Sequence, residues 1–392
     1  MAQDPSGASM PTSRSRSPWR DESHQPAGKK GNQSSWWHDS HARAQHVLDE
    51  AQRVTSKYLL PSGESKLTGQ PALGQGDMGS SLNFEALTVT VTADDPIQWV
   101  EKGAEIFKDC RVLIVRNLFS PDITDVVLGS MRELHRDWSA KYDPERVGNR
   151  CPGRYDMGSA YGTGHLTHLP GYLEALEHFA QKGGLEFLRK LGMYKFVGGQ
   201  GQLCLANTDN WQPLHSDYRR PSKALEALWD DAAHVPFIDL MFTVHPLTSQ
   251  NGAMRILPGQ PSVDTTYWQR ESNPPPALDS EPESFKTSQL YPLPAGCGVF
   301  RDIRIWHGGV PNTTDEDRHI PVLQFHSSLS LSLCKDRLNE GPGVDVHDVN
   351  SKLSVETRAF VSPHIIRSTE DEEPKIDQER LQWPGIFSDH FY

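Results

Sequence analysis

The triplet His215-Ser216-Asp217 places an imidazole and a carboxylate two residues apart, in a stretch (residues 210–218) that we interpret as extended chain. Residues i and i+2 of a strand point to the same face, so both side chains can bind one metal ion. A second such triplet, His135-Arg136-Asp137, lies in a segment with helical periodicity. There the two side chains point about 200° apart, so we expect the second triplet to bind no metal.

A third possible ligand, His307, ends residues 298–307, which we interpret as one strand. Alternation along such a strand places five side chains on one face, namely Val299, Arg301, Ile303, Ile305 and His307. Apart from Arg301 this face is apolar, so a buried, neutral His307 at its inward end could complete a metal site with His215 and Asp217. Two histidines and one carboxylate on one side of an ion form the facial triad of non-haem Fe(II) oxygenases, which leaves three positions for cosubstrate and O2.

Arg318 follows His307 by eleven residues, across a predicted hairpin loop. A guanidinium that faces the same cavity suits the distal carboxylate of a dicarboxylate chelator, because arginine forms bidentate, charge-assisted hydrogen bonds. Such a bond is worth roughly 1.5–3 kcal/mol, enough to select 2-oxoglutarate over pyruvate-like acids. These residues therefore predict an iron site with 2-oxoglutarate as its cosubstrate.

Each of these assignments has a structural alternative. His215 and Asp217 could form a hydrogen-bonded pair without metal, His307 could be a core histidine with satisfied nitrogens, and Arg318 could pair with Asp315 or Asp317 on the surface. We interpret Arg154, Tyr155 and Arg255 as structural or unassigned. We interpret as structural four histidines that have no carboxylate at i+2, namely His234, His245, His319 and His326.

The segments around these residues are mostly short and β-rich. We expect strands at residues 87–91, 110–117, 202–206, 236–244, 253–257, 298–307 and 318–331, and helices at 41–60, 120–138 and 170–191. Residues 143–168 have the composition of a loop. The order lacks βαβ alternation, which favours a sandwich or barrel over a doubly wound sheet.

Composition narrows the class of protein. The 392 residues carry a net charge of -12, with a pI near 5.8, which argues against nucleic-acid and anionic-membrane partners. Five scattered cysteines without a C-x-x-C indicate reduced thiols rather than disulfides or a zinc site. The chain has no apolar run of about 18 residues and no signal-peptide pattern, so we expect a cytoplasmic protein of undetermined oligomeric state.

Three motifs, in this order and spacing, resemble the phytanoyl-CoA dioxygenase family of Fe(II)/2-oxoglutarate oxygenases. They are Gln212-x-x-His215-x-Asp217, Asn251-Gly252-x-x-Arg255-x-x-Pro258-Gly259, and Trp306-His307-Gly308-x-x-x-Asn312-x-x-x-x-x-Arg318. The resemblance covers about residues 95–335. It departs from the family at Gln260-Pro261, where the family often has Ser-His, and at an insertion of residues 270–286.

The resemblance implies a mainly β fold with flanking helices, a double-stranded β-helix or jelly roll. It implies His215, Asp217 and His307 as iron ligands, with Arg318 and, more weakly, Gln212 binding 2-oxoglutarate. We accordingly divide the chain into a disordered tail (1–82) with one amphipathic helix, an oxygenase domain (83–350) and a C-terminal extension (351–392), packed on the domain or partly disordered.

The predicted activity is that of a dioxygenase that hydroxylates an unactivated C–H of a small metabolite or natural-product intermediate, releasing succinate and CO2. Because Asp217 is a carboxylate rather than a small residue, no coordination position is left for chloride, and halogenation is disfavoured. The alternatives are an acyl-CoA hydroxylase of the same family, a jelly-roll binding or scaffold protein without catalysis, and a cupin-type metalloenzyme that does not use 2-oxoglutarate.

Overall fold

A computed structural model describes residues 49–58, 82, 84–142, 148, 153–158, 165–209, 211–212, 234–252, 254–259, 288–290, 292–334 and 343–367. Two of the three predicted iron ligands, His215 and Asp217, lie outside these residues. So do the predicted tail up to residue 48, Gln260-Pro261, the insertion at 270–286 and the end of the C-terminal extension.

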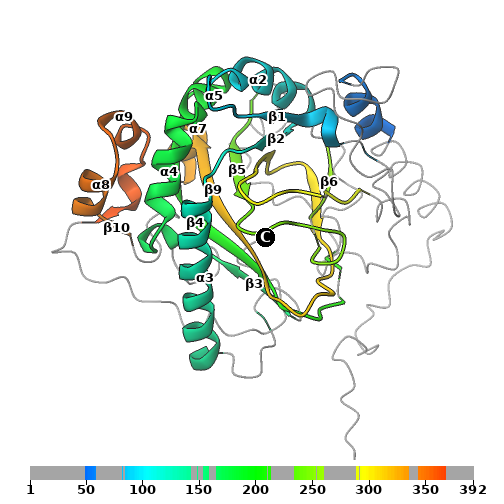
Figure 1. Ribbon diagram of the computed structural model, residues 1–392. Coiled ribbons are helices and arrows are strands. Elements are labelled where there is room, and N and C mark those ends of the chain that lie inside the picture. The colour runs from blue at the N-terminus through cyan, green and yellow to red at the C-terminus, as the bar shows by residue number, and fades with distance from the viewer. Residues whose placement is uncertain are drawn as a thin grey trace, which may run out of the picture.

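Seven strands form one large mixed sheet in the order β1-β2-β7-β5-β9-β4-β3 (Figure 1). Their bounds are Thr88–Thr90 (β1), Val112–Arg116 (β2), Arg154–Met157 (β3), Tyr194–Cys204 (β4), Phe237–Phe242 (β5), Gly298–Asp302 (β7) and Arg318–Ser327 (β9). β1 runs parallel to β2, and the other neighbours are antiparallel. A smaller sheet pairs β6 (Met254–Leu257) with β8 (Trp306–Gly309).

Helices cover one face of the large sheet, as Figure 1 shows. They are α2 (Trp99–Cys110), α3 (Pro121–Tyr142), α4 (Tyr172–Gln181) and α5 (Gly184–Leu191). Their rings pack on the sheet: Phe187 of α5 lies 4.6 Å from Phe300 of β7, and Phe179 of α4 lies 5.4 Å from Phe325 of β9, both between ring centroids. This arrangement of two sheets with flanking helices confirms the predicted double-stranded β-helix.

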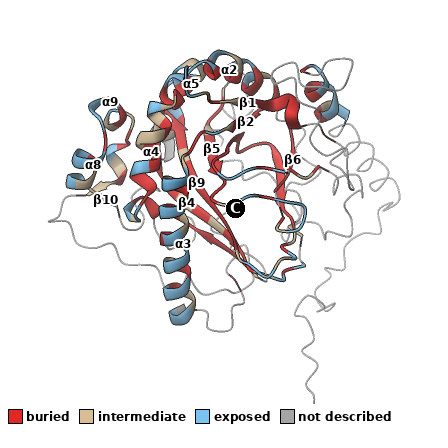
Figure 2. Ribbon diagram, viewed as in Figure 1, coloured by how far each residue is buried: buried red, intermediate tan, exposed pale blue. Residues whose placement is uncertain are grey.

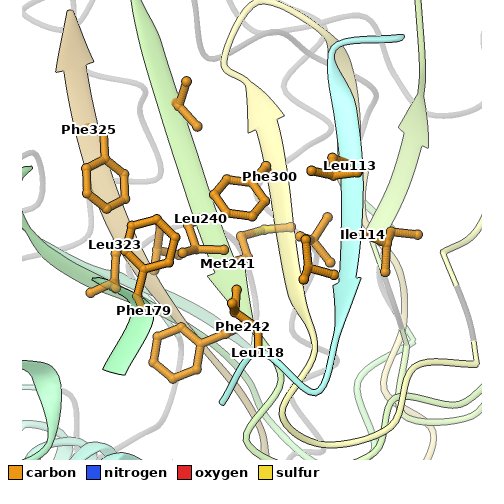
Figure 3. Close-up of a cluster of buried hydrophobic side chains, with 14 of the residues drawn as sticks. Leu113, Ile114, Leu118, Phe179, Leu240, Met241, Phe242, Phe300, Leu323 and Phe325 are labelled. Atoms are coloured by element: carbon orange, nitrogen blue, oxygen red, sulfur yellow. The ribbon is translucent and has the colours of Figure 1, made fainter. Parts of the chain in front are cut away.

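The two faces of the large sheet differ in polarity because side chains alternate along each strand. The face toward the helices is apolar, and Figure 3 shows Leu240, Phe300, Leu323 and Phe325 together with Phe179. The central strands are buried almost throughout (Figure 2). Alternation places a polar set on the opposite face: Gln200, Asp239, Arg301, Arg318 and Gln324. That inner face is therefore where a polar ligand can be bound.

The predicted single strand at residues 298–307 is wrong. The chain turns after Asp302, whose Oδ1 accepts a hydrogen bond from the backbone N of Arg304 (3.0 Å) and whose carbonyl accepts one from Ile305 (3.1 Å). A buried ion pair between the Arg304 guanidinium and the Asp302 carboxylate (2.7 Å) holds this turn. The chain thus crosses from β7 in the large sheet to β8 in the small one, so strand alternation cannot place His307.

Other boundaries also differ from expectation. α2 was not predicted, and the predicted helix at 170–191 is two helices, because Gly183 has a left-handed φ of 88°. The predicted strand at 202–206 is the end of the longer β4, and the strand expected to reach residue 331 ends at Ser327, where α7 (Ser328–Cys334) begins. β3 lies within the predicted loop at 143–168.

The ends of the described chain add smaller elements. Residues 49–56 are helical, with Ala51 and Val54 buried. The extension contributes α8 (Val346–Lys352), α9 (Val355–Arg358) and the pair β10 (Val344–Asp345) and β11 (Ile366–Arg367). Three 3-10 helices span Phe84–Leu87, Leu166–His168 and Pro363–Ile365. None of the helices in the described ranges is long and apolar enough to cross a membrane.

The cysteines whose side chains are described, Cys110, Cys204 and Cys297, are buried free thiols. Burial raises the pKa of Cys110 to about 12 and that of Cys297 to about 11. Both therefore stay protonated and act as small core residues.

Replacing Asp302 with alanine should lower the free energy of unfolding by about 3–5 kcal/mol, because it leaves the buried Arg304 guanidinium without its carboxylate. Urea denaturation of the two proteins measures this difference. Asp137→Ala, which removes a carboxylate from an exposed ion pair on α3, is the control and should change the stability little. Equal effects of the two substitutions would contradict this account of the turn.

Candidate active site

His307 enters the interior from β8 and is almost completely buried, at 2% exposure. Its Nδ1 lies 3.1 Å from the carbonyl oxygen of Ile305, which assigns the ring proton to Nδ1 and the lone pair to Nε2. Histidine ligands of metals are commonly held in this way, with one ring nitrogen donating to a backbone carbonyl. The tautomer is thus suited to metal binding through Nε2.

A chain of polar side chains connects the large sheet to His307. The amide of Gln200 on β4 donates to Gln324 on β9 (2.5 Å), and Gln324 donates to Oδ1 of Asp239 on β5 (2.9 Å). Nη2 of Arg301 on β7 donates to Oδ2 of Asp239 (2.5 Å), and Nη1 lies 3.0 Å from both ring nitrogens of His307. Asp239 is therefore the anionic centre of a buried network that reaches the predicted metal ligand.

Arg318 points inward at the start of β9 and is 5% exposed. Its Nη1 donates to the carbonyl of Gly252. The same atom lies 3.2 Å from the carbonyl oxygen of Asn251 and 3.2 Å from that of Val310. The alternative surface pairing is not what the structure shows for Asp317, whose carboxylate accepts from the backbone N of Ala206 (2.9 Å). Arg318 instead lines an internal pocket.

Arg154 of β3 lies beside Arg318 in that pocket. Its Nη2 donates to the carbonyl of Val310 (2.5 Å), the same oxygen that Arg318 contacts. Burial lowers the pKa of Arg318 to about 10, and the like charge of Arg154 adds to this, so the Arg318 guanidinium still remains a cation at neutral pH. Two adjacent buried cations attract an anion, and a carboxylate is the anion that their planar donors fit best.

Gln212 is anchored to β8 through Gly309. The backbone N of Gln212 donates to the Gly309 carbonyl (2.8 Å), and the backbone N of Gly309 donates to Oε1 of Gln212 (2.9 Å). A Cβ on Gly309 would lie 2.6 Å from Nη1 of Arg154 and 2.7 Å from Oε1 of Gln212, so a larger residue would displace the ends of both side chains. Gln212 lines the same pocket as the two arginines.

Arg255 is fully buried and has a structural role. Its Nη2 donates to the backbone carbonyl of Gln212, and its guanidinium lies over the ring of Trp211, 5.1 Å from the centroid. It therefore holds the backbone that leads into residue 213, as expected for a structural arginine.

Residues 201–320 match the model of the family described as phytanoyl-CoA dioxygenase (PhyH). The matched segment contains the three motifs by which the sequence resembles this family. It spans 120 of the 392 residues and contains Gln212, His215, Asp217, His307 and Arg318. The protein is accordingly an oxidoreductase of the Fe(II)- and 2-oxoglutarate-dependent oxygenase class, with Fe(II), 2-oxoglutarate and O2 as cofactor and cosubstrates.

Solved structures similar to the chain include three non-haem enzymes. The "non-heme alpha ketoglutarate dependent carbocyclase SnoK from nogalamycin biosynthesis" is 13% identical (58% of this chain, 84% of that one, TM-score 0.41). EctD from S. alaskensis "with 2-oxoglutarate and 5-hydroxyectoine" is 16% identical (66% and 87%, TM-score 0.39). The "non-heme monooxygenase, ThoJ-Ni complex" is 15% identical (57% and 76%, TM-score 0.35). A comparison with curated proteins gives no match.

Within the described residues, no three His, Cys, Asp or Glu side chains lie together as a metal site. The structure thus brings His307, Arg318 and Gln212 to one region, while His215 and Asp217 remain predictions. The two side chains of the helical triplet point apart: His135 is buried and Asp137 is exposed on the other side of α3. Nδ1 of His135 instead lies 3.9 Å from Asp317.

Sequence reasoning missed two features of this region, Asp239 and the convergence of Arg154 and Arg318 on the Val310 carbonyl. Asp239 is the only charged residue in the apolar run of residues 236–244. A single charge in a buried strand requires a partner, and that pattern was a usable signal. The partner itself, Arg301, could not be read from the sequence, because it is 62 residues away.

The histidines expected to be structural are held by neutral contacts. His234 Nε2 lies 3.0 Å from the Ser327 hydroxyl, and His245 Nε2 accepts from the backbone N of His319 (3.1 Å). The ring of His326 stacks on Phe237, with centroids 3.5 Å apart. Burial lowers the pKa of His319 and of His326 to about 3, so both are neutral in the folded protein.

These two depressed pKa values predict a loss of stability in acid. An unfolded histidine has a pKa near 6.5, so between pH 6.5 and about 3 the unfolded chain binds protons that the folded protein does not. The contribution of the two histidines to the free energy of unfolding should be fully present above pH 6.5. It should fall as the pH decreases, by up to about 1.4 kcal/mol per pH unit for each histidine. His326→Phe should reduce this slope relative to the wild type in urea denaturation between pH 4 and 7. Identical slopes would contradict the assignment.

Proposed function

We propose that this protein is an Fe(II)- and 2-oxoglutarate-dependent dioxygenase that hydroxylates an unactivated C–H of a small polar molecule. The observation that carries the proposal is the pairing of Gln212 with Gly309. Gly309 follows His307 by two residues, so the pairing anchors Gln212 beside the end of β8. His215 in turn follows Gln212 by three residues. Three residues span at most about 11 Å, so His215 stays within that distance of the anchor.

His215, Asp217 and His307 would hold the iron. His307 supports this role through its tautomer, since its Nδ1–H is directed at the Ile305 carbonyl and its Nε2 carries the lone pair. Two imidazoles and a carboxylate are the donor set that suits Fe(II) with open positions. Because only one of the three ligands is anionic, the bound Fe(II) would keep a positive charge that attracts an anionic cosubstrate.

Arg318, Arg154 and Gln212 would hold 2-oxoglutarate. The two guanidiniums converge on the Val310 carbonyl and are placed to bind the distal carboxylate, while Gln212 lines the same pocket. The bound iron supplies the oxidising chemistry, in which 2-oxoglutarate, O2 and R–H give succinate, CO2 and R–OH. The protein orients the reactants and keeps the charged groups in a preorganised, buried setting.

The inner face of the large sheet favours a polar substrate over a long acyl chain. On β4 and β9 three of the partly exposed residues on the inner face are amides, namely Gln200, Gln202 and Gln324. Amides left against an apolar chain would lose hydrogen bonds, at a cost of about 1–3 kcal/mol each. The acidic chain, with its net charge of -12, also offers little attraction for the phosphates of coenzyme A. The acyl-CoA hydroxylase and the catalytically inactive binding protein are the alternatives.

We also propose that the protein acts in the cytoplasm. The three described cysteine side chains are free thiols, and such thiols are stable in a reducing compartment.

Anaerobic addition of Fe(II) and then 2-oxoglutarate should produce the weak visible charge-transfer band of the chelated complex. Exposure to O2 should then form succinate. The measurements are absorbance spectroscopy and quantification of succinate. If the band does not form and no succinate appears, the oxygenase proposal is wrong, and a binding protein becomes the better interpretation.

Single substitutions separate the two halves of the site. His215→Ala and His307→Ala should lower the affinity for Fe(II) at least tenfold, because each removes a ligand. Arg318→Ala should leave metal affinity intact and raise the Kd for 2-oxoglutarate at least tenfold, the equivalent of one charge-assisted bond. His135→Ala is the matched control from the helical triplet and should change neither affinity. Anaerobic titration calorimetry measures both constants, and normal metal binding by His215→Ala would refute the ligand assignment.

A further inference from the structure

Arg301 stands out in the interior because it joins a buried ion pair to the predicted metal ligand. It is 2% exposed, and its Nη2 donates to Asp239, which is itself 4% exposed. Its Nη1 lies 3.0 Å from both nitrogens of the His307 ring. With the proton on Nδ1, only Nε2 carries an in-plane lone pair, and a position equally far from both nitrogens places Nη1 over the ring and not in its plane.

Side chains from several strands hold this guanidinium in position. Asp239 is fixed through both oxygens, one bound to Arg301 and the other to Gln324, which is in turn bound by Gln200. Arg301 is therefore held on β7 by groups from β4, β5 and β9. A side chain fixed in this way is preorganised, which makes it effective in recognising a ligand.

We propose that Arg301 is a specificity-determining residue of the metal centre, which recognises the chelating 1-carboxylate of the 2-oxo acid. The proposal rests on the proposed function above. Nη1 stands 3.0 Å from the His307 nitrogen that would carry the ion, so it can donate to an anionic oxygen bound to that ion. Arg318 and Arg154 line a pocket whose lining does not include Arg301 or His307, and they would bind the distal carboxylate. Different arginines would thus bind the two ends of the dicarboxylate.

Electrostatics gives this role a distinctive signature. A cation beside His307 repels a divalent metal ion but attracts the anionic chelator that follows it. Loss of Arg301 should therefore preserve or improve metal affinity and weaken binding of the 2-oxo acid. A purely structural role would weaken both together, because the metal ligand and its surroundings would be disturbed.

The test uses the full chain under anaerobic conditions. Arg301→Met alone would leave the Asp239 carboxylate buried without its arginine, so the main variant is Arg301→Met with Asp239→Asn, which keeps an acceptor for Gln324. The matched control is Arg116→Met with Glu85→Gln, which removes a partly buried Arg–carboxylate pair (2.7 Å) at the far end of β2. Folding of each variant is checked by urea denaturation.

Titration calorimetry with Fe(II), then with 2-oxoglutarate, and separately with oxalate gives three dissociation constants. Oxalate carries the chelating carboxylates but no distal arm. We expect the Arg301 variant to keep its Fe(II) Kd within threefold or lower it, and to raise the Kd of 2-oxoglutarate and of oxalate at least tenfold. Arg318→Ala should weaken 2-oxoglutarate alone, Arg301→Lys should recover part of the loss, and the Arg116 control should resemble the wild type.

Unchanged oxalate affinity in the Arg301 variant would overturn the proposal. So would a parallel loss of Fe(II) and 2-oxoglutarate affinity, which indicates a structural role only. A wild-type protein that binds Fe(II) but shows no 2-oxoglutarate binding would refute the proposed function itself. That outcome is distinct, because it is seen before any substitution is made.

Discussion

The buried ion pair between Asp302 and Arg304 determines where the predicted active site can form. It holds the turn that ends β7 and begins β8, and so it moves the chain from the large sheet to the small one. His307 reaches the interior only because of that crossing. The guanidinium also donates to the carbonyl of His234, just before β5, which ties the turn to the strand that carries Asp239. One local interaction thus sets the relation between the predicted metal ligand and the network that surrounds it.

The large sheet separates two functions on its two faces. The face toward the helices is a packed aromatic and aliphatic core, in which Phe300 contacts rings from α2, α4 and α5. The other face carries charges and amides, which would cost free energy if they were not paired. Pairing of Arg301 with Asp239, and of Asp239 with Gln324, offsets that cost. The apolar face supplies stability, and the polar face is preserved for binding.

Much of the fold could be predicted because local signals agreed with the tertiary structure. Residues 236–244 and 253–257 are β-rich and bounded by turn residues, and both contain strands close to their predicted limits. Prediction failed where a long-range contact overrode the local pattern. Residues 298–307 alternate like one strand, yet the Asp302–Arg304 pair breaks them in two. β4 extends through Gly198 and Gly199, residues that disfavour strands, because it pairs with β9 along its length.

For the site, the sequence alone determined the chemistry that is available. The His-x-Asp triplet, a histidine that could complete a facial triad and an arginine eleven residues after it predict a donor set for iron and a dicarboxylate. The spacing on a helix or strand also decides which pairs can chelate, as His135 and Asp137 on α3 illustrate.

Only the tertiary structure decided which charged groups meet. Arg301 and Asp239 are 62 residues apart and pair because β5 and β7 are neighbours in register. Arg154 and Arg318 converge because β3 and β9 flank β4. The physical reason is that contacts between strands depend on register and sheet order, which arise from the packing of the whole domain and not from spacing along the chain.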